Sequence, residues 1–196
     1  MTRPPVAVAI TGGIGAGKSE ALAAFARNGA ATVSSDEIVH HLLQRDDVKQ
    51  RVVERLGNGV VAPDGELDRG AIGTAVFNDA AALRWLEQLL HPLVSGEYMQ
   101  WRADLGRLPN PPRVCVTEVP LLYEVGAEDR FDKVVVITAP AKLRRARSPE
   151  VAVTERETRL LPDAEKVKRA DYAYTNVGSI EQLDDFVASV MRDLAP

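Results

Sequence analysis

A glycine-rich segment near the start of the chain has the residue types and the spacing that bind phosphate groups. Residues 12–19 read GGIGAGKS, which matches the pattern G-x-x-x-x-G-K-[ST]. Glycines let the backbone turn in ways that a Cβ atom would forbid, so that several N–H groups can point into one hollow. Lys18 supplies a cation for the β- and γ-phosphates, and the Ser19 hydroxyl can bind Mg²⁺. The segment predicts a nucleoside triphosphate site formed by Gly12, Gly13, Gly15, Ala16, Gly17, Lys18, Ser19 and Glu20.

Two carboxylates follow predicted strands elsewhere in the chain. Asp36 comes just after a short strand and could orient an attacking hydroxyl group and accept its proton, or it could cap the helix that follows. Glu118 lies at the end of another strand, where an acidic residue can help to hold Mg²⁺, or it could be a solvated strand-end residue. The spacing alone leaves both choices open.

A basic segment stands out in a chain whose net charge is −4. Residues 141–169 are predicted to be helical, and they carry many arginines and lysines together with several acidic residues that can pair with them. We interpret the segment as a lid whose arginines close over the triphosphate and neutralise charge on the transferred group. Arg145 is our candidate for this role, with Arg144, Arg147 and Arg156 as alternatives.

Strands that alternate with helices must position these residues. Apolar runs predict strands at 6–11, 31–34, 113–119, 133–138 and 172–175. Helices are predicted at 18–28 and 179–193, and residues 46–106 look almost wholly helical, with breaks at 57–59, 63–65 and His91-Pro92. This order predicts an α/β fold in three layers, with a central five-stranded parallel sheet, an inserted helical lobe and a helical lid. Ligands bind at the carboxyl ends of the strands in such sheets.

The composition is that of an ordinary globular protein. The chain has 196 residues, of which 45% are hydrophobic and 27% are charged, and this length fits one domain. The net charge gives no general attraction to nucleic acid or to anionic membranes, so neither is an expected partner. Cys115 is the only cysteine, and no stretch approaches the length of a membrane span, so we expect a cytoplasmic protein. A monomer or weak oligomer is expected.

Several stretches together resemble dephospho-CoA kinase, the family that phosphorylates the 3′-hydroxyl of dephospho-CoA with ATP. These stretches follow one another along nearly the whole chain. They are TGGIGAGKS at 11–19, SDEI at 35–38, LDRGAI at 67–72, VF at 76–77, LEQLLHPL at 86–93, VPLLYE at 119–124, ADY at 170–172 and NVG at 176–178. The first stretch is common to many nucleotide-binding enzymes, whereas LLHP and PLL-aromatic-Glu are far more specific to this family.

The resemblance implies a single P-loop kinase domain over residues 1–196. Its core would comprise 1–45, 107–140 and 170–196, its CoA-binding lobe 46–106 and its lid 141–169. ATP and dephospho-CoA would be the substrates, with Mg²⁺ as cofactor. Asp36 would be the base, and Asn176 to Gly178 would border the adenine. The residues near the acceptor would be His91, Pro120, Leu121 and Glu124, although a lone histidine is more often structural.

The sequence departs from the family pattern at three places. The family often has Asp-x-Asp after the second strand, but the first of these positions is Ser34 here, so that only Asp36 is left to serve. Glu20 stands where Thr is common. The lid looks short, with Ser148-Pro149 interrupting it, and Leu160 replaces a usual glutamine.

Three other interpretations remain. Another P-loop kinase would act on a nucleoside, nucleotide or shikimate-like acceptor, and a substrate panel would distinguish it. A GTP-dependent switch protein would need an Asn-Lys-x-Asp motif and an Asp-x-x-Gly motif, and the sequence has neither. A degenerate kinase kept as a scaffold would show no turnover of ATP with dephospho-CoA.

Overall fold

The computed structural model describes residues 4–77, 79–147 and 160–194, and the chain divides into two compact units. The first, the core unit, comprises Met1–Ser35 and Arg102–Pro196, and the second, the helical unit, comprises Asp36–Trp101. The predicted lobe at 46–106 falls mostly within the helical unit, which begins ten residues earlier. Asp36 and the phosphate-binding segment therefore belong to different units.

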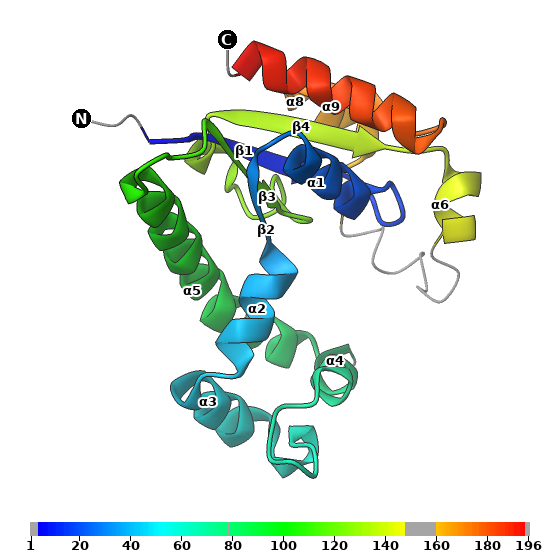
Figure 1. Cartoon of the computed structure of the whole chain (residues 1–196). Helices are drawn as coiled ribbons and strands as arrows, with labels where there is room; N and C mark the ends of the chain where they lie inside the picture. The colour runs from blue at the N-terminus through cyan, green and yellow to red at the C-terminus, as the bar shows by residue number, and fades with distance from the viewer. Residues whose placement is uncertain (1–3, 78, 148–159, 195–196) are drawn as a thin grey trace. The chain divides into compact units, whose positions relative to one another are not determined.

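A five-stranded parallel sheet forms the centre of the core unit (Figure 1). Its strands are β1 (Val6–Thr11), β2 (Ala31–Ser34), β3 (Val114–Glu118), β4 (Lys133–Thr138) and β5 (Tyr172–Thr175). They lie in the order β2-β3-β1-β4-β5, with all neighbours parallel. The fold class is as predicted, and the predicted strand bounds agree with the structure except that β3 is one residue shorter at each end.

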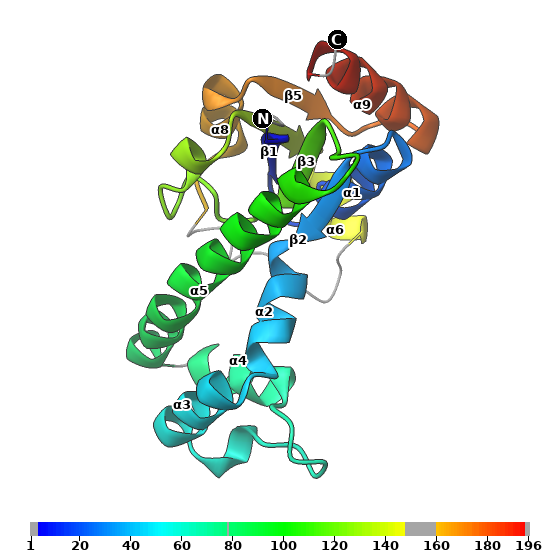
Figure 2. The ribbon, with the colours of Figure 1, turned by 60° about the vertical axis from the view of Figure 1, so that its left-hand side comes forward.

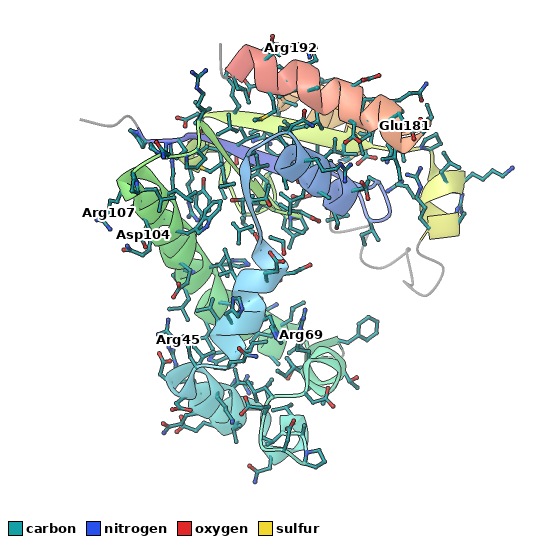
Figure 3. The ribbon with its side chains drawn as sticks, viewed as in Figure 1. Arg45, Arg69, Asp104, Arg107, Glu181 and Arg192 are labelled. Carbon is teal, nitrogen blue, oxygen red and sulfur yellow. The ribbon has the colours of Figure 1, made fainter. Side chains whose placement is uncertain are left out.

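Two helices cover one face of this sheet. Helix α1 (Lys18–Arg27) packs against the C-terminal helix α9 (Ile180–Leu194). Alternate strand residues, such as Val8, Ile10 and Val116, point into the same cluster as Phe25 of α1. Figure 3 shows Glu181 and Arg192 at opposite ends of α9, where their charges complement the helix dipole.

The other face of the sheet packs against loops and the short helix α8 (Asp163–Arg169). Ala9, Val134 and Val136 alternate with the residues of the first face and contact Leu122 and its neighbours. Figure 2 shows β5 between α8, which precedes it along the chain, and α9, which follows it. Asp171 anchors the start of β5, because its carboxylate accepts hydrogen bonds from Lys133 Nζ and from the Val134 amide, each at 2.8 Å. Partial burial alone would raise the pKa of Asp171, but these two donors hold it below its usual value.

The helical unit contains most of the segment between β2 and β3. Helix α2 (Ser35–Leu43) follows β2 directly, and α3 (Asp46–Leu56), the 3₁₀ turn η1 (Asn58–Val60) and α4 (Arg69–Phe77) come next. Breaks at 57–59 and 63–65 occur as predicted. Arg55 of α3 lies over the ring of Trp85, with 6.0 Å between the guanidinium carbon and the ring centroid.

The predicted break at His91-Pro92 is wrong. Helix α5 (Ala80–Arg107) continues through Pro92 for 28 residues and enters the core unit at Arg102. An internal proline removes one backbone hydrogen bond and costs about 3 kcal/mol, but a long helix keeps its other bonds. Burial of Leu89, Leu90 and Tyr98 on the same helix offsets that cost.

Two short helices represent the predicted lid in the structure. They are α6 (Ala141–Arg147) and α8, and residues 148–159, including Ser148, Pro149 and Arg156, lie outside the described residues. The 3₁₀ turn η2 (Glu128–Arg130) precedes β4. Within the described ranges, no helix is both long enough and apolar enough to span a membrane.

Candidate active site

The phosphate-binding segment connects β1 to α1 and depends on its glycines. Gly12 has a φ of +146°, and a Cβ atom there would collide with the carbonyl oxygen of Ile137 in β4. Gly17 has a φ of +97°, and a Cβ atom there would collide with the side-chain amide of Asn176. Both positions combine a left-handed conformation with a close neighbour, so only glycine fits. The segment follows a buried strand and opens a helix, as a phosphate site requires.

Lys18, Ser19 and Glu118 meet at the carboxyl end of the sheet. Ser19 Oγ donates a 3.0 Å hydrogen bond to Glu118 Oε2, and Lys18 Nζ lies 3.9 Å from Glu118 Oε1. Lys18 Nζ also donates to the Gly13 carbonyl at 3.2 Å. Lys18 and Glu118 are both about nine-tenths buried, so Glu118 is not a solvated strand-end residue. Two oxygen donors, one of them a carboxylate, fit Mg²⁺, which commonly uses one or two protein oxygens together with phosphate and water.

Asn176 connects the end of β5 to the phosphate-binding segment. Its side-chain Nδ2 donates a 2.9 Å hydrogen bond to the Ala16 carbonyl, and its backbone N–H donates to the Thr138 carbonyl at 2.7 Å. The side chain is buried. Asn176 thus fixes the shape of the segment from a strand end far away in the sequence. Its contact with adenine stays a prediction.

A cavity of about 230 Å³ opens beside the N-terminal end of α1. It is lined by Gly17, Glu20, Arg147, Asn176, Gly178, Ser179, Ile180 and Leu183. Gln182 orders the backbone of the lining residue Ser179, because its Oε1 accepts the Ser179 N–H at 3.2 Å, as in the capping box at the start of a helix. The cavity therefore joins the phosphate-binding segment to the apolar side chains of α9, which suits a nucleoside.

Glu20 faces this cavity and belongs to a chain of charges. Arg27, two turns further along α1, donates to Glu20 Oε1 at 2.9 Å. It also donates to Asp184 Oδ1 of α9, at 2.7 Å from Nη2 and 3.2 Å from Nε. The hydrogen bonds from Arg27 to Asp184 and Glu20 raise the pKa of Arg27 above its usual value. Sequence reasoning missed Arg27, because a basic residue in the last turn of a helix looks like an ordinary favourable surface charge.

Helix α6 places its arginines at different distances from the phosphate-binding segment. A Cβ atom on Gly13 would lie 2.5 Å from Arg144 Nη1, and one on Gly15 would lie 2.6 Å from the Arg144 carbonyl oxygen, so that Arg144 packs directly on the segment. It also lines a second cavity, of about 260 Å³, together with Gly13 and residues 160–163. Arg147 lines the first cavity. Arg145, the predicted residue, is exposed.

The predicted acceptor residues lie in both units. Asp36 is the second residue of α2, where its charge suits the helix dipole, and it is exposed. Ser34, two residues before Asp36, pairs in register with Glu118 of β3. His91 is exposed in the middle of α5. Pro120 and Leu121 begin the turn after β3, where the Pro120 carbonyl accepts a 3.3 Å hydrogen bond from Thr11 Oγ1.

Glu124 has a partner that sequence reasoning missed. Lys166 of α8 is completely buried, and its Nζ lies 2.8 Å from Glu124 Oε1. The same oxygen accepts the Leu161 N–H at 2.9 Å. Glu124 thus binds the segment that returns from the predicted lid. Next to it in the chain, burial of Tyr123 raises the pKa of the tyrosine hydroxyl. No pattern around Lys166 indicates this pairing, because the residue looks like one of several surface lysines.

Comparison with known proteins finds one family that matches most of the chain. The family model described as dephospho-CoA kinase matches residues 6–182. A dephospho-CoA kinase from Symbiobacterium thermophilum is 40% identical over 194 residues, covering 94% of this chain and 80% of the relative. The crystal structure of TT1252 from Thermus thermophilus has a TM-score of 0.77 and 30% identity, covering 99% of this chain and 100% of that chain. A shikimate kinase from Bacteroides thetaiotaomicron has a TM-score of 0.53 at 15% identity, covering 97% of this chain and 99% of that chain, which shows a shared fold alone.

Proposed function

The chain belongs to the dephospho-CoA kinase family, and we propose that it transfers the γ-phosphoryl group of ATP to the ribose 3′-hydroxyl of dephospho-CoA. The products would be coenzyme A and ADP, in the last step of coenzyme A synthesis. One observation carries the proposal beyond the similarity itself: Lys18 and Ser19 converge on the buried carboxylate of Glu118 beside the glycine segment. That arrangement suits a triphosphate. The G-x-x-x-x-G-K-[ST] pattern of residues 12–19, which forms it, is intact.

The core unit supplies most of the groups that would bind ATP. Backbone N–H groups of residues 12–19 surround the phosphates, and the N-terminal end of the α1 dipole attracts their charge. Lys18 Nζ, released from the Gly13 carbonyl, would bind the β- and γ-phosphates. Ser19 and Glu118 would hold Mg²⁺, which neutralises charge on the phosphates when it is bound. Asn176 and Gly178 would border the adenine in the first cavity.

The remaining groups would act on the acceptor. Asp36 would accept the proton of the 3′-hydroxyl as it attacks the γ-phosphorus. His91, Pro120 and Leu121 would contact dephospho-CoA, and Glu124 would support that region through Lys166. We also propose a cytoplasmic location, as expected for a chain whose lone cysteine, Cys115, is a buried thiol outside any disulfide.

An assay of acceptors tests the proposed function. ADP release is measured by a coupled assay with dephospho-CoA, adenosine, AMP, pantothenate and shikimate, each with ATP and Mg²⁺. We expect fast turnover with dephospho-CoA alone, because only this acceptor combines the adenosine ribose with the pantetheine arm that a CoA-binding lobe would recognise. Faster turnover with another acceptor would reject the substrate, and no turnover with any of them would favour a scaffold.

The position of α6 makes Arg144 a stronger candidate for the phosphate clamp than Arg145. Arg144 packs on Gly13 and Gly15, whereas Arg145 is exposed. We therefore expect Arg144→Ala to lower kcat by about 10²-fold, the effect of removing one group that stabilises transition-state charge. Arg145→Ala serves as the matched comparison in steady-state kinetics. A large loss in Arg145→Ala with little change in Arg144→Ala would restore the sequence-based prediction.

A further inference from the structure

Among the described residues that line the first cavity, Glu20 is the one with an acidic side chain. It comes immediately after the lysine and serine of the phosphate-binding segment, in the first turn of α1, where a carboxylate suits the helix dipole but repels a triphosphate. The Arg27 guanidinium offsets part of this charge at 2.9 Å. The structure thus keeps a carboxylate, oriented by an arginine, beside the nucleotide site.

The groups that line the cavity suit the different parts of a nucleotide, and Glu20 suits its ribose. Gly17 belongs to the segment that would hold the phosphates. Ile180 and Leu183, at the start of α9, supply apolar surface for a base. Glu20 lies on α1 one turn beyond Gly17. In a nucleoside triphosphate the sugar joins the phosphates to the base, so the sugar would lie between Gly17 and this apolar surface, within reach of Glu20.

A carboxylate is well suited to a ribose. Ionised Glu20 accepts hydrogen bonds only, with about four acceptor sites on its two oxygens, and Arg27 occupies one site on Oε1. The two vicinal hydroxyls of a ribose are donors at a spacing that one carboxylate can bind, and acidic residues bind the ribose hydroxyl in other nucleotide sites. Resting on the proposed ATP site, we propose that Glu20, positioned by Arg27, binds the ribose hydroxyls of ATP and selects ribonucleotides over deoxynucleotides.

Equilibrium binding tests this proposal without any need for turnover. Kd values are measured by calorimetry for ATP, 2′-deoxy-ATP, 3′-deoxy-ATP and purine riboside triphosphate, which lacks the 6-amino group. The wild-type chain should bind at least one of the two deoxy analogues about tenfold more weakly than ATP, because the analogue would lose one charge-assisted hydrogen bond. Loss of the 6-amino group should change Kd by less than about twofold.

The variant Glu20→Ala should raise Kd for ATP about tenfold and bring ATP and the deoxy analogues within about twofold of one another. Glu20→Gln keeps the shape of the side chain and loses its charge, so it serves as a control for a change in folding. Its discrimination between ATP and the deoxy analogues should be intermediate. Asp185→Ala removes an exposed carboxylate of α9 that does not line the cavity, and its Kd values should match wild type.

The outcomes separate this inference from the proposed function. Equal Kd values for ATP and both deoxy analogues in the wild-type chain would overturn the inference, as would unchanged discrimination in Glu20→Ala. A loss of discrimination against purine riboside triphosphate in Glu20→Ala would assign Glu20 to the base and overturn the ribose contact. Ribose selection through Glu20 without turnover of dephospho-CoA would support the inference while rejecting the proposed acceptor.

Discussion

Replacing Asp36 with asparagine is expected to lower kcat by about 10²–10⁴-fold while ATP still binds. Asparagine has nearly the same shape as aspartate but cannot take a proton from an attacking hydroxyl group, so the variant should lose general base catalysis. Asp36 belongs to the helical unit, outside the segment 12–19 that would hold the phosphates. The Kd for ATP should therefore change little. Steady-state kcat with dephospho-CoA and calorimetric Kd for ATP measure the two effects separately.

Glu37→Gln provides the matched control for Asp36→Asn. Glu37 is the next residue in the first turn of α2, is also exposed, and carries the same charge at the positive end of the helix dipole. Both substitutions remove one dipole-complementing charge, but only that of Asp36 would remove the base. If Asp36→Asn keeps a kcat close to that of Glu37→Gln, the carboxylate of Asp36 serves the helix and another group accepts the proton.

The sheet and the phosphate-binding segment could be predicted because their signals are local. Val6 to Ile10 is a continuous apolar run followed by Thr11 and Gly12, and a run of this kind fits a parallel strand that is buried on both faces. The pattern of residues 12–19 then fixes both the turn and the start of α1. Placing Glu118 and Asn176 near this turn needed one more rule, that the carboxyl ends of parallel strands share an edge. Their contacts with Ser19 and Ala16 follow that rule.

Long-range pairs were beyond sequence reasoning. Lys166 and Glu124 are 42 positions apart and form a buried ion pair. The local sequence around each residue does not indicate its partner. Arg27 and Asp184 are 157 positions apart and meet only because α1 and α9 pack on the same face of the sheet. Ion pairs of this kind can be assigned from side-chain charges only after the packing of the helices is known.

The sequence left the choice among the arginines of α6 open for a different reason. Arg144 and Arg145 are neighbours, and adjacent helical residues point about 100° apart, so a shift in the helix start exchanges their roles. The sequence gives a helix boundary only to within a few residues. The structure places α6 at Ala141–Arg147, and this register directs Arg144 onto Gly13.

Replacing Lys18 with alanine is expected to weaken both ATP binding and catalysis. Lys18 Nζ is the buried cation of the phosphate-binding segment, 3.2 Å from the Gly13 carbonyl and 3.9 Å from Glu118 Oε1. Its flexible side chain can follow the negative charge as it moves during transfer, so its loss should lower kcat by about 10²–10³-fold. The lost charge-assisted hydrogen bond to phosphate should also raise Kd for ATP about tenfold or more.

The effect of Lys18→Ala on activity must be distinguished from an effect on folding. The buried carboxylate of Glu118 contacts Lys18 and the Ser19 hydroxyl, and the variant would leave it only the hydroxyl of these two. The double variant Lys18→Ala with Glu118→Gln removes the uncompensated charge as well, and its thermal midpoint should recover relative to that of Lys18→Ala alone. Lys168→Ala removes an exposed lysine that pairs with Glu165, and it should leave kcat and Kd unchanged. Wild-type kinetics in Lys18→Ala would mean that the glycine segment does not bind the triphosphate, because no phosphate site of this kind can lose its central cation without a cost in transition-state charge.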